Sequence, residues 1–140
     1  MSEESTTPDL VELTRRQFEA VNRRDMDAVM SRFPPDGVYD TSPDGLIVYE
    51  GPAAIRGFIG EWWDAFEELA LEPEDVLDLG HGIVFSVVCQ SARPANSTAR
   101  MQRREAYVLE WVEDMTRRVT VYTDIEEGRA AAERLAAERE

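Results

Sequence analysis

The stretch Met101–Val112 reads MQRREAYVLEWV, and its alternation decides the fold. In an extended strand, successive side chains point to opposite faces. One face of this strand then carries Arg103, Glu105, Tyr107, Leu109 and Trp111. Because Leu109 and Trp111 need a hydrophobic core, Arg103 and Glu105 are aimed inward with them. Inward charges are costly unless they are paired or act on a ligand, so the strand predicts a pocket with polar groups in its wall.

The composition is that of a single globular domain of ordinary size. The chain has 140 residues, of which 43% are hydrophobic and 31% are charged, and its formal net charge is −14. A surface this negative repels nucleic acid and anionic membranes, so we expect neither as a partner. No apolar run is long enough to span a membrane, and the polar, acidic start MSEESTTPD does not read as a signal peptide. The single cysteine, Cys89, fits a reducing compartment, and we expect a cytoplasmic protein.

The residue inventory also limits the chemistry. All 15 basic residues are arginine, so no lysine can form a Schiff base or act as an amine base. The one histidine, His81, lies in a predicted turn, and the sequence shows no set of His, Cys and carboxylate residues with metal-ligand spacing. A glycine-rich phosphate loop is absent as well. We therefore expect neither a metal nor an organic cofactor.

Apolar periodicity and turn residues predict helices first and strands afterwards. Asp9 can cap the first helix, and Pro34-Pro35 ends the second. In chain order, the predicted elements are a helix from Leu10, a helix over Met26–Phe33, strands Gly37–Thr41 and Leu46–Glu50, a long helix Ala53–Leu71, strands Glu74–Leu79, Ile83–Ala92, Ser97–Val112 and Arg117–Asp124, and a helix Glu126–Glu140.

This order predicts an α+β fold, because helices followed by a meander of strands do not build alternating βαβ units. We expect a cone, in which a curved antiparallel or mixed sheet wraps around the long helix and the N-terminal helices close it. Residues 1–8 are expected to form a disordered tail, 9–128 the cone domain and 129–140 a helical tail. The outer face of such a sheet is apolar and needs cover, which predicts a homodimer through that face.

Two motifs carry a resemblance to a known family. Asn22–Ala28 has the pattern N-x-x-D-x-D-A, and Tyr49–Arg56 has the pattern Y-x-G-x-x-A-I-R. With PDGVYD between them and VYTDIEEGRAA near the end, the chain resembles the nuclear-transport-factor-2-like superfamily and, within it, SnoaL-like proteins over residues 9–130. The resemblance implies the cone fold. The superfamily includes ketosteroid isomerases, polyketide cyclases, epoxide hydrolases, dehydratases and proteins that only bind or assemble, so fold alone does not settle activity.

The reactive positions of ketosteroid isomerases are only partly retained. Their sites combine an Asp base with a Tyr donor and a protonated Asp donor. By the resemblance, the Tyr position falls on Gln17, which lies in the middle of the apolar arc of the first helix, and the base position falls on Thr41. Asp40 is one residue earlier and points to the other face. The third position falls on Glu105, so one carboxyl group is retained as Glu.

The pattern of epoxide hydrolases is retained in part too. It implies Tyr39 on the first strand and an Arg-x-acid element at Arg103 and Glu105. Its second acid falls on Val121. Because two carboxylates are needed to activate water and protonate the epoxide oxygen, this chemistry is incomplete.

Glu105, Arg103 and Asp40 are the candidates for catalysis. Glu105 is either an acid or base whose pKa is tuned by burial and by Arg103, or half of a structural ion pair at the rim of the cone. Asp40 can act as a base if a bulge shifts its strand by one residue, and otherwise it is a solvated strand-end residue. The expected ligand-binding residues are Gln17, Tyr39, Thr41, Trp62, Phe66, Tyr107 and Val121.

Two functions remain open from the sequence. The first is a cofactor-free enzyme that performs isomerisation, aldol-type cyclisation, dehydration or hydrolysis on a small, largely apolar molecule, with Glu105 as acid or base. The second is a module that binds a small ligand or only dimerises. The inward Arg103 and Glu105 favour the first function, and the missing acids at Thr41 and Val121 favour the second.

Overall fold

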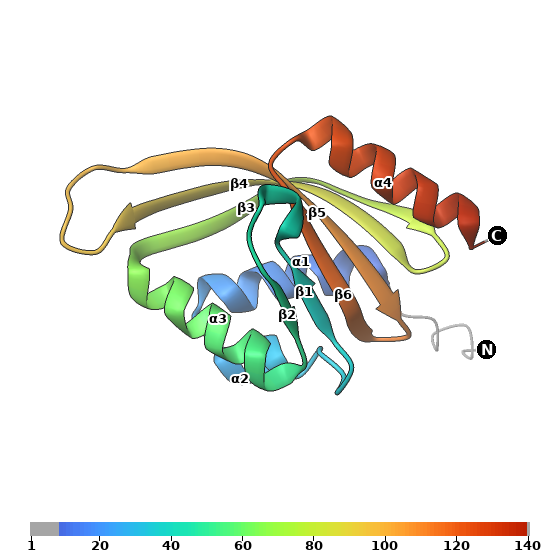
Figure 1. Ribbon diagram of the computed structural model, residues 1–140, viewed down its shortest axis with the longest axis horizontal. Coiled ribbons are helices and arrows are strands. Elements are labelled where there is room, and N and C mark those ends of the chain that lie inside the picture. Colours follow the sequence, from blue (N-terminus) through green and yellow to red (C-terminus); the bar gives the residue numbers. More distant parts are fainter. Residues whose placement is uncertain (1–8, 140) are drawn as a thin grey trace.

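The computed structural model describes residues 9–139, apart from the side chain of Asp44, so the expected tail over residues 1–8 lies outside the described residues (Figure 1). In chain order, the elements are α1 Leu10–Asn22, α2 Met26–Met30, β1 Val38–Asp40, a 3₁₀ turn Ser42–Asp44, β2 Val48–Glu50, α3 Pro52–Ala65, β3 Phe66–Gly80, β4 Ile83–Pro94, β5 Met101–Val112, β6 Met115–Tyr122 and α4 Ile125–Glu138.

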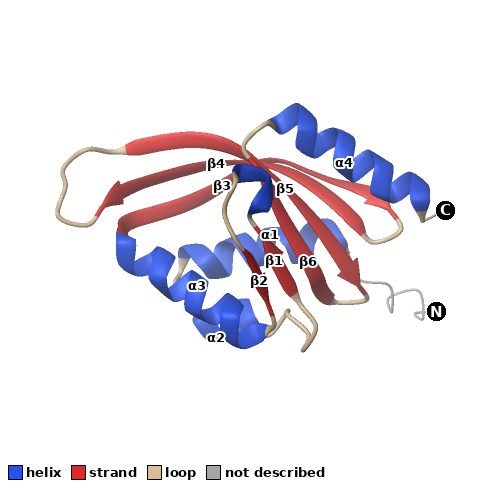
Figure 2. Cartoon of the chain, in the orientation of Figure 1, coloured by secondary structure: helices blue, strands red, loops and turns tan. Residues whose placement is uncertain are grey.

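The strands form one curved, mixed sheet with the order β2-β1-β6-β5-β4-β3. Strands β1 and β6 are parallel, and all other neighbours are antiparallel. Helices α1, α2 and α3 lie against one face of the sheet, and α4 lies against the other (Figure 2). The predicted α+β cone is confirmed.

The loop between α1 and α2 explains the first of the two motifs. The side-chain amide of Asn22 donates to the carbonyl of Leu71 at 2.9 Å and accepts from the N–H of Leu71 at 2.7 Å, so it pairs with the β3 backbone as a strand would. Asp25 caps α2 by accepting from the N–H of Ala28 at 3.1 Å. Asn22 therefore joins α1 to the edge strand of the sheet, and Asp25 fixes the start of α2.

The long helix was predicted six residues too far, since it ends at Ala65 and the segment up to Leu71 belongs to β3. The spacing of Trp62, Phe66 and Leu69 fits a helix, but β3 pairs with β4 from Phe66 onwards. The guanidinium of Arg24 also donates to the carbonyls of Trp63 and Phe66, at 3.0 and 2.7 Å, where the helix leaves carbonyls without partners. Contacts with β4 and Arg24 thus outweigh the helical spacing of the apolar residues.

Strand β3 is longer than expected because it continues through Pro73. Proline lacks a ladder donor and is tolerated on an edge strand or at a bulge. Pro73 satisfies both conditions, since β3 is an edge strand and its pairing with β4 shifts register between Pro73 and Asp75. The predicted turn over Gly80–Gly82 is present, with His81 exposed.

The sheet separates two cores. The larger one fills the cone between its concave face and α1–α3, and there the indole N–H of Trp111 donates to the hydroxyl of Thr14 at 3.1 Å. The smaller one lies under α4, where Phe85 and Val108 of the sheet meet Ala132 and Ala136. The helix expected as a tail therefore covers part of the outer face of the sheet in the same chain. The homodimer stays a prediction.

Candidate functional site

A cavity of about 210 Å³ lies inside the cone. Every site residue predicted from the sequence lines it except Gln17 and Asp40: Tyr39, Thr41, Trp62, Phe66, Arg103, Glu105, Tyr107 and Val121. The exposed side chains of Leu46 and Met101 also line it, and they mark its mouth. Phe66 reaches the cavity from the start of β3, since it is not part of the helix.

Glu105 and Arg103 form the predicted ion pair. Their Oε2 and Nη2 atoms are 2.6 Å apart, and the side chain of Glu105 is 3% exposed whereas that of Arg103 is 52% exposed. The carboxylate is therefore buried in the cavity wall, and the guanidinium reaches it from the solvent side. Burial of a charge is tolerated when a partner compensates for the lost hydration. The inward placement of Glu105 is confirmed, and its part in any chemistry stays a prediction.

Two buried tyrosines lie beside this carboxylate. Tyr39 on β1 and Tyr107 on β5 both line the cavity. Burial raises the pKa of both well above the usual value, and the negative charge of Glu105 raises them further. Both hydroxyls therefore stay protonated and can donate hydrogen bonds at neutral pH.

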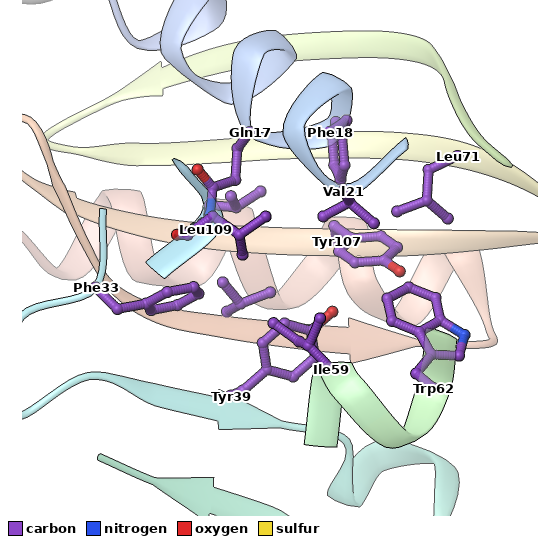
Figure 3. Close-up of a pocket in the computed structure, with 12 residues that line it drawn as sticks. Gln17, Phe18, Val21, Phe33, Tyr39, Ile59, Trp62, Leu71, Tyr107 and Leu109 are labelled. Carbon is purple, nitrogen blue, oxygen red and sulfur yellow. Dashed lines mark hydrogen bonds between the residues drawn. The ribbon is translucent and has the colours of Figure 1, made fainter. Parts of the chain in front are cut away.

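Tyr39, Tyr107 and Trp62 line both this cavity and a small apolar void of about 30 Å³, and Figure 3 shows the residues around the void. Gln17 lies at this void and not in the larger cavity. Its amide nitrogen donates to the carbonyl of Val29 at 3.0 Å. Gln17 was expected to bind a ligand together with the other cavity residues, but it lies at this void, where its amide joins α1 to α2.

Asp40 does not join the site either. The pairing of β1 with β2 and with β6 is regular, so no bulge turns Asp40 into the cone. Its carboxylate accepts from the N–H and hydroxyl of Ser42, at 2.8 and 2.6 Å, and pairs with Arg118 at 2.5 Å. Thr41 does line the cavity, but its hydroxyl donates to the carbonyl of Ile47 at 2.6 Å. The expected base position thus holds no carboxylate.

The sequence analysis missed Gln90, Leu46, Phe58 and Met101 as lining residues. Gln90 could have been found, because alternation along β4 places it on the same face as Val88 and Val84, two residues of the cone core. Phe58 lies on the predicted long helix, where it stacks on Tyr49 at 4.5 Å between ring centroids. Leu46 lies in the loop before β2, and Met101 is the first residue of β5, so both reach the cavity from the ends of elements.

Within residues 9–139, no three His, Cys, Asp or Glu side chains are grouped so that they could hold a metal ion. In the same part of the chain, every helix is too short or too polar to cross a bilayer.

Comparison with known proteins identifies the family. The sequence profile of the SnoaL-like domain matches residues 14–133. The chain belongs to the SnoaL-like family. The resemblance seen in Asn22–Ala28 and Tyr49–Arg56 is thereby confirmed, as is membership of the nuclear-transport-factor-2-like superfamily. No curated protein sequence matches the chain.

Solved structures share the fold of this SnoaL-like protein at low sequence identity. A protein of ketosteroid-isomerase-like fold from Catenulispora acidiphila, crystallised with trimethylamine, is 14% identical, with a TM-score of 0.72 over 84% of this chain and 86% of that one. TerC, crystallised with polyporic acid, is 14% identical, with a TM-score of 0.71 over 88% and 97%. SalBIII, an epoxide hydrolase/cyclase-like enzyme of pyran ring formation in salinomycin, is 22% identical, with a TM-score of 0.70 over 79% and 87%.

Proposed function

We propose that this SnoaL-like protein is a cofactor-independent enzyme that moves a proton on a small, largely apolar molecule. The observation that carries the proposal is Glu105, a buried carboxylate in a mostly apolar cavity, tied to Arg103 and next to the neutral hydroxyls of Tyr39 and Tyr107. An apolar cavity with a few convergent polar groups and perturbed titratable residues is the usual form of an active site.

In the proposed mechanism, the substrate is a carbonyl compound. The tyrosine hydroxyls donate hydrogen bonds to its oxygen, and Glu105 takes a proton from the carbon next to the carbonyl. The negative charge that develops on the oxygen is stabilised by these donors. Glu105 then returns the proton to the same or a neighbouring carbon, and Arg103 holds the carboxylate in place throughout.

The number of carboxylates in the cavity limits which reactions the site can catalyse. Among the described residues that line the cavity, Glu105 is the only one, and the position of a second acid holds Val121. Isomerisation, aldol-type cyclisation and dehydration can run with one group that takes and returns a proton. Epoxide hydrolysis, which needs two carboxylates, is disfavoured.

The structural neighbours support the proposal only at the level of fold. SalBIII is described as an epoxide hydrolase/cyclase-like enzyme, so a protein with this fold performs catalysis. The second candidate function is ligand binding without catalysis. It is favoured by Thr41, which stands at the base position with its hydroxyl already bonded to Ile47.

Acetophenone offers a direct test, because its methyl protons exchange with deuterium when a base removes them. In D₂O, we expect the wild-type protein to accelerate this exchange, as followed by proton NMR. Glu105→Gln should lower the rate by about 10²- to 10⁴-fold, the usual contribution of a general base. The variant should still bind the ketone, which a rise in melting temperature reports. Equal exchange rates in the wild-type protein and in Glu105→Gln would contradict catalysis by Glu105 and would favour a cavity that only binds ligands.

A further inference from the structure

Gln90 is a largely buried residue whose side-chain amide faces the cavity. It lies on β4, is 8% exposed and lines the cavity that contains Glu105. Within residues 9–139, its amide makes no hydrogen bond with a side chain or with the backbone. By contrast, the other buried amide side chain, that of Gln17, donates to Val29. Because the amide faces the cavity and has no partner among these residues, its donors and acceptor are available to a molecule bound there.

The register of the sheet places Gln90 close to the proposed acid–base group. Gln90 is opposite Arg103, and Val88 is opposite Glu105. Gln90 and Glu105 are therefore diagonal neighbours on the same face, with Cβ atoms roughly 7 Å apart. The cavity wall thus contains two polar sites. The first consists of Glu105, Tyr39 and Tyr107, and the second, close to it, is the amide of Gln90.

The size of the cavity limits what can reach both positions. A cavity of about 150 Å³ holds benzene. At about 210 Å³, this cavity has room for one substituted ring. The amide of Gln90 offers two N–H donors and one acceptor oxygen, so it can bond either a carbonyl or a hydroxyl group.

We propose that the substrate is a single-ring molecule with two oxygen functions, and that Gln90 is the specificity-determining residue that binds the second one. The first oxygen is the carbonyl held by the tyrosines beside Glu105. The second is a hydroxyl or carbonyl group placed so that it reaches the amide. This inference rests on the proposed function, because it takes the cavity to be the site where Glu105 acts.

Two matched ketones test the proposal. Acetophenone carries one oxygen, and 3-hydroxyacetophenone adds a second oxygen to the same ring. We expect the wild-type protein to bind 3-hydroxyacetophenone about tenfold more tightly by calorimetry, the effect of one well-placed hydrogen bond in a buried site. In Gln90→Leu, which keeps the size of the side chain but lacks its polar atoms, this preference should vanish, while acetophenone binds within about threefold of its wild-type affinity.

Gln102→Leu is the matched control. Gln102 lies on β5 with an exposed side chain, so the same substitution there should leave the tenfold preference intact. Gln90→Leu should also melt at or above the wild-type temperature, because it removes no hydrogen bond between described residues and adds an apolar side chain to the cavity wall. A clear fall in its melting temperature would make the amide structural and would overturn the proposal.

Three further outcomes would overturn it: no preference in the wild-type protein, a preference that survives in Gln90→Leu, or no binding of either ketone at millimolar concentration. The preference is measured as binding and can be repeated in Glu105→Gln. Failure of deuterium exchange with an intact, Gln90-dependent preference would refute the catalytic function alone. Normal exchange without the preference would refute only the role of Gln90.

Discussion

Asp40 keeps its negative charge on the outer face of the sheet, where it is nearly buried. Burial alone would raise the pKa of its carboxyl group. The hydrogen bonds from Ser42 and the pairing with Arg118 outweigh burial, and the net pKa lies below the ordinary value of 3.8. The residue therefore joins the end of β1 to β6 through its charge, which is a structural role.

Asp40→Asn should lower stability at neutral pH, because the lost bonds involve a charged acceptor. We expect a loss of roughly 1–2 kcal/mol in the free energy of unfolding near pH 7. Since the folded pKa lies below the unfolded one, this stabilisation is complete above the unfolded value and is lost as the pH falls through the folded value. Urea denaturation should therefore give free energies of unfolding for the wild type and the variant that converge as the pH falls through the lowered pKa of Asp40.

The control for this experiment is Asp114→Asn. Asp114 pairs with Arg32 at 3.3 Å, but its side chain is exposed, so the change should stay within about 0.5 kcal/mol. An Asp40→Asn variant as stable as the wild type at every pH would contradict the structural role.

Helix α4 packs so closely on the sheet that one position has no room for a side chain. A Cβ atom at Gly128 would lie 2.7 Å from the Cβ of Ala106 and 3.2 Å from that of Tyr122. Neither neighbour is the flexible end of a long side chain, so the helix would have to move. Glycine at position 128 therefore allows the first turn of α4 to pack directly on β5 and β6.

Gly128→Ala should destabilise the protein, although alanine is the better helix former. We expect a loss of roughly 1–3 kcal/mol from overpacking against Ala106. Gly57→Ala in α3 is the matched control, because a Cβ at Gly57 meets nothing within 4 Å. There the gain in helix propensity should raise stability by about 0.5–1 kcal/mol. The midpoints of urea denaturation measure both changes in stability. If both substitutions stabilise the protein, α4 does not pack closely on the sheet at Gly128.

At the scale of the whole molecule, the outer face of the sheet has two parts. Helix α4 covers β4 and β5 with alanines and Leu135, so this part of the apolar face has its cover in the same chain. Beyond the helix, the exposed Val112 borders a groove that also contains Val38 and Arg118. Val112 is therefore the exposed apolar residue of this face through which the expected homodimer can be tested.

The homodimer is tested by light scattering coupled to size exclusion. We expect the mass of a dimer at micromolar concentration, and Val112→Asp should shift it towards the monomer by placing a charge in the interface. A monomeric wild-type protein would contradict the prediction and would mean that α4 alone provides the cover. The cytoplasmic location, expected from composition, stays a prediction as well.

The local sequence pattern was sufficient to predict which residues of β5 face the site. Alternation alone places Glu105, Tyr107 and Leu109 on one face, and the turn at His81 follows from its two glycines. The same rule, applied along β4, would have brought in Gln90. Period and turn chemistry are properties of neighbouring residues, so they can be predicted from the sequence.

Only the tertiary structure decided where elements end and which groups meet. The end of α3 depends on Arg24 and on β4, the bond of Gln17 depends on the position of α2, and the face of Asp40 depends on the register between β1 and β6. The position of α4 on the sheet depends on contacts between Gly128 and Ala106. Each of these involves residues far apart in the chain, whose contact free energies outweigh the small local preferences that a sequence pattern records.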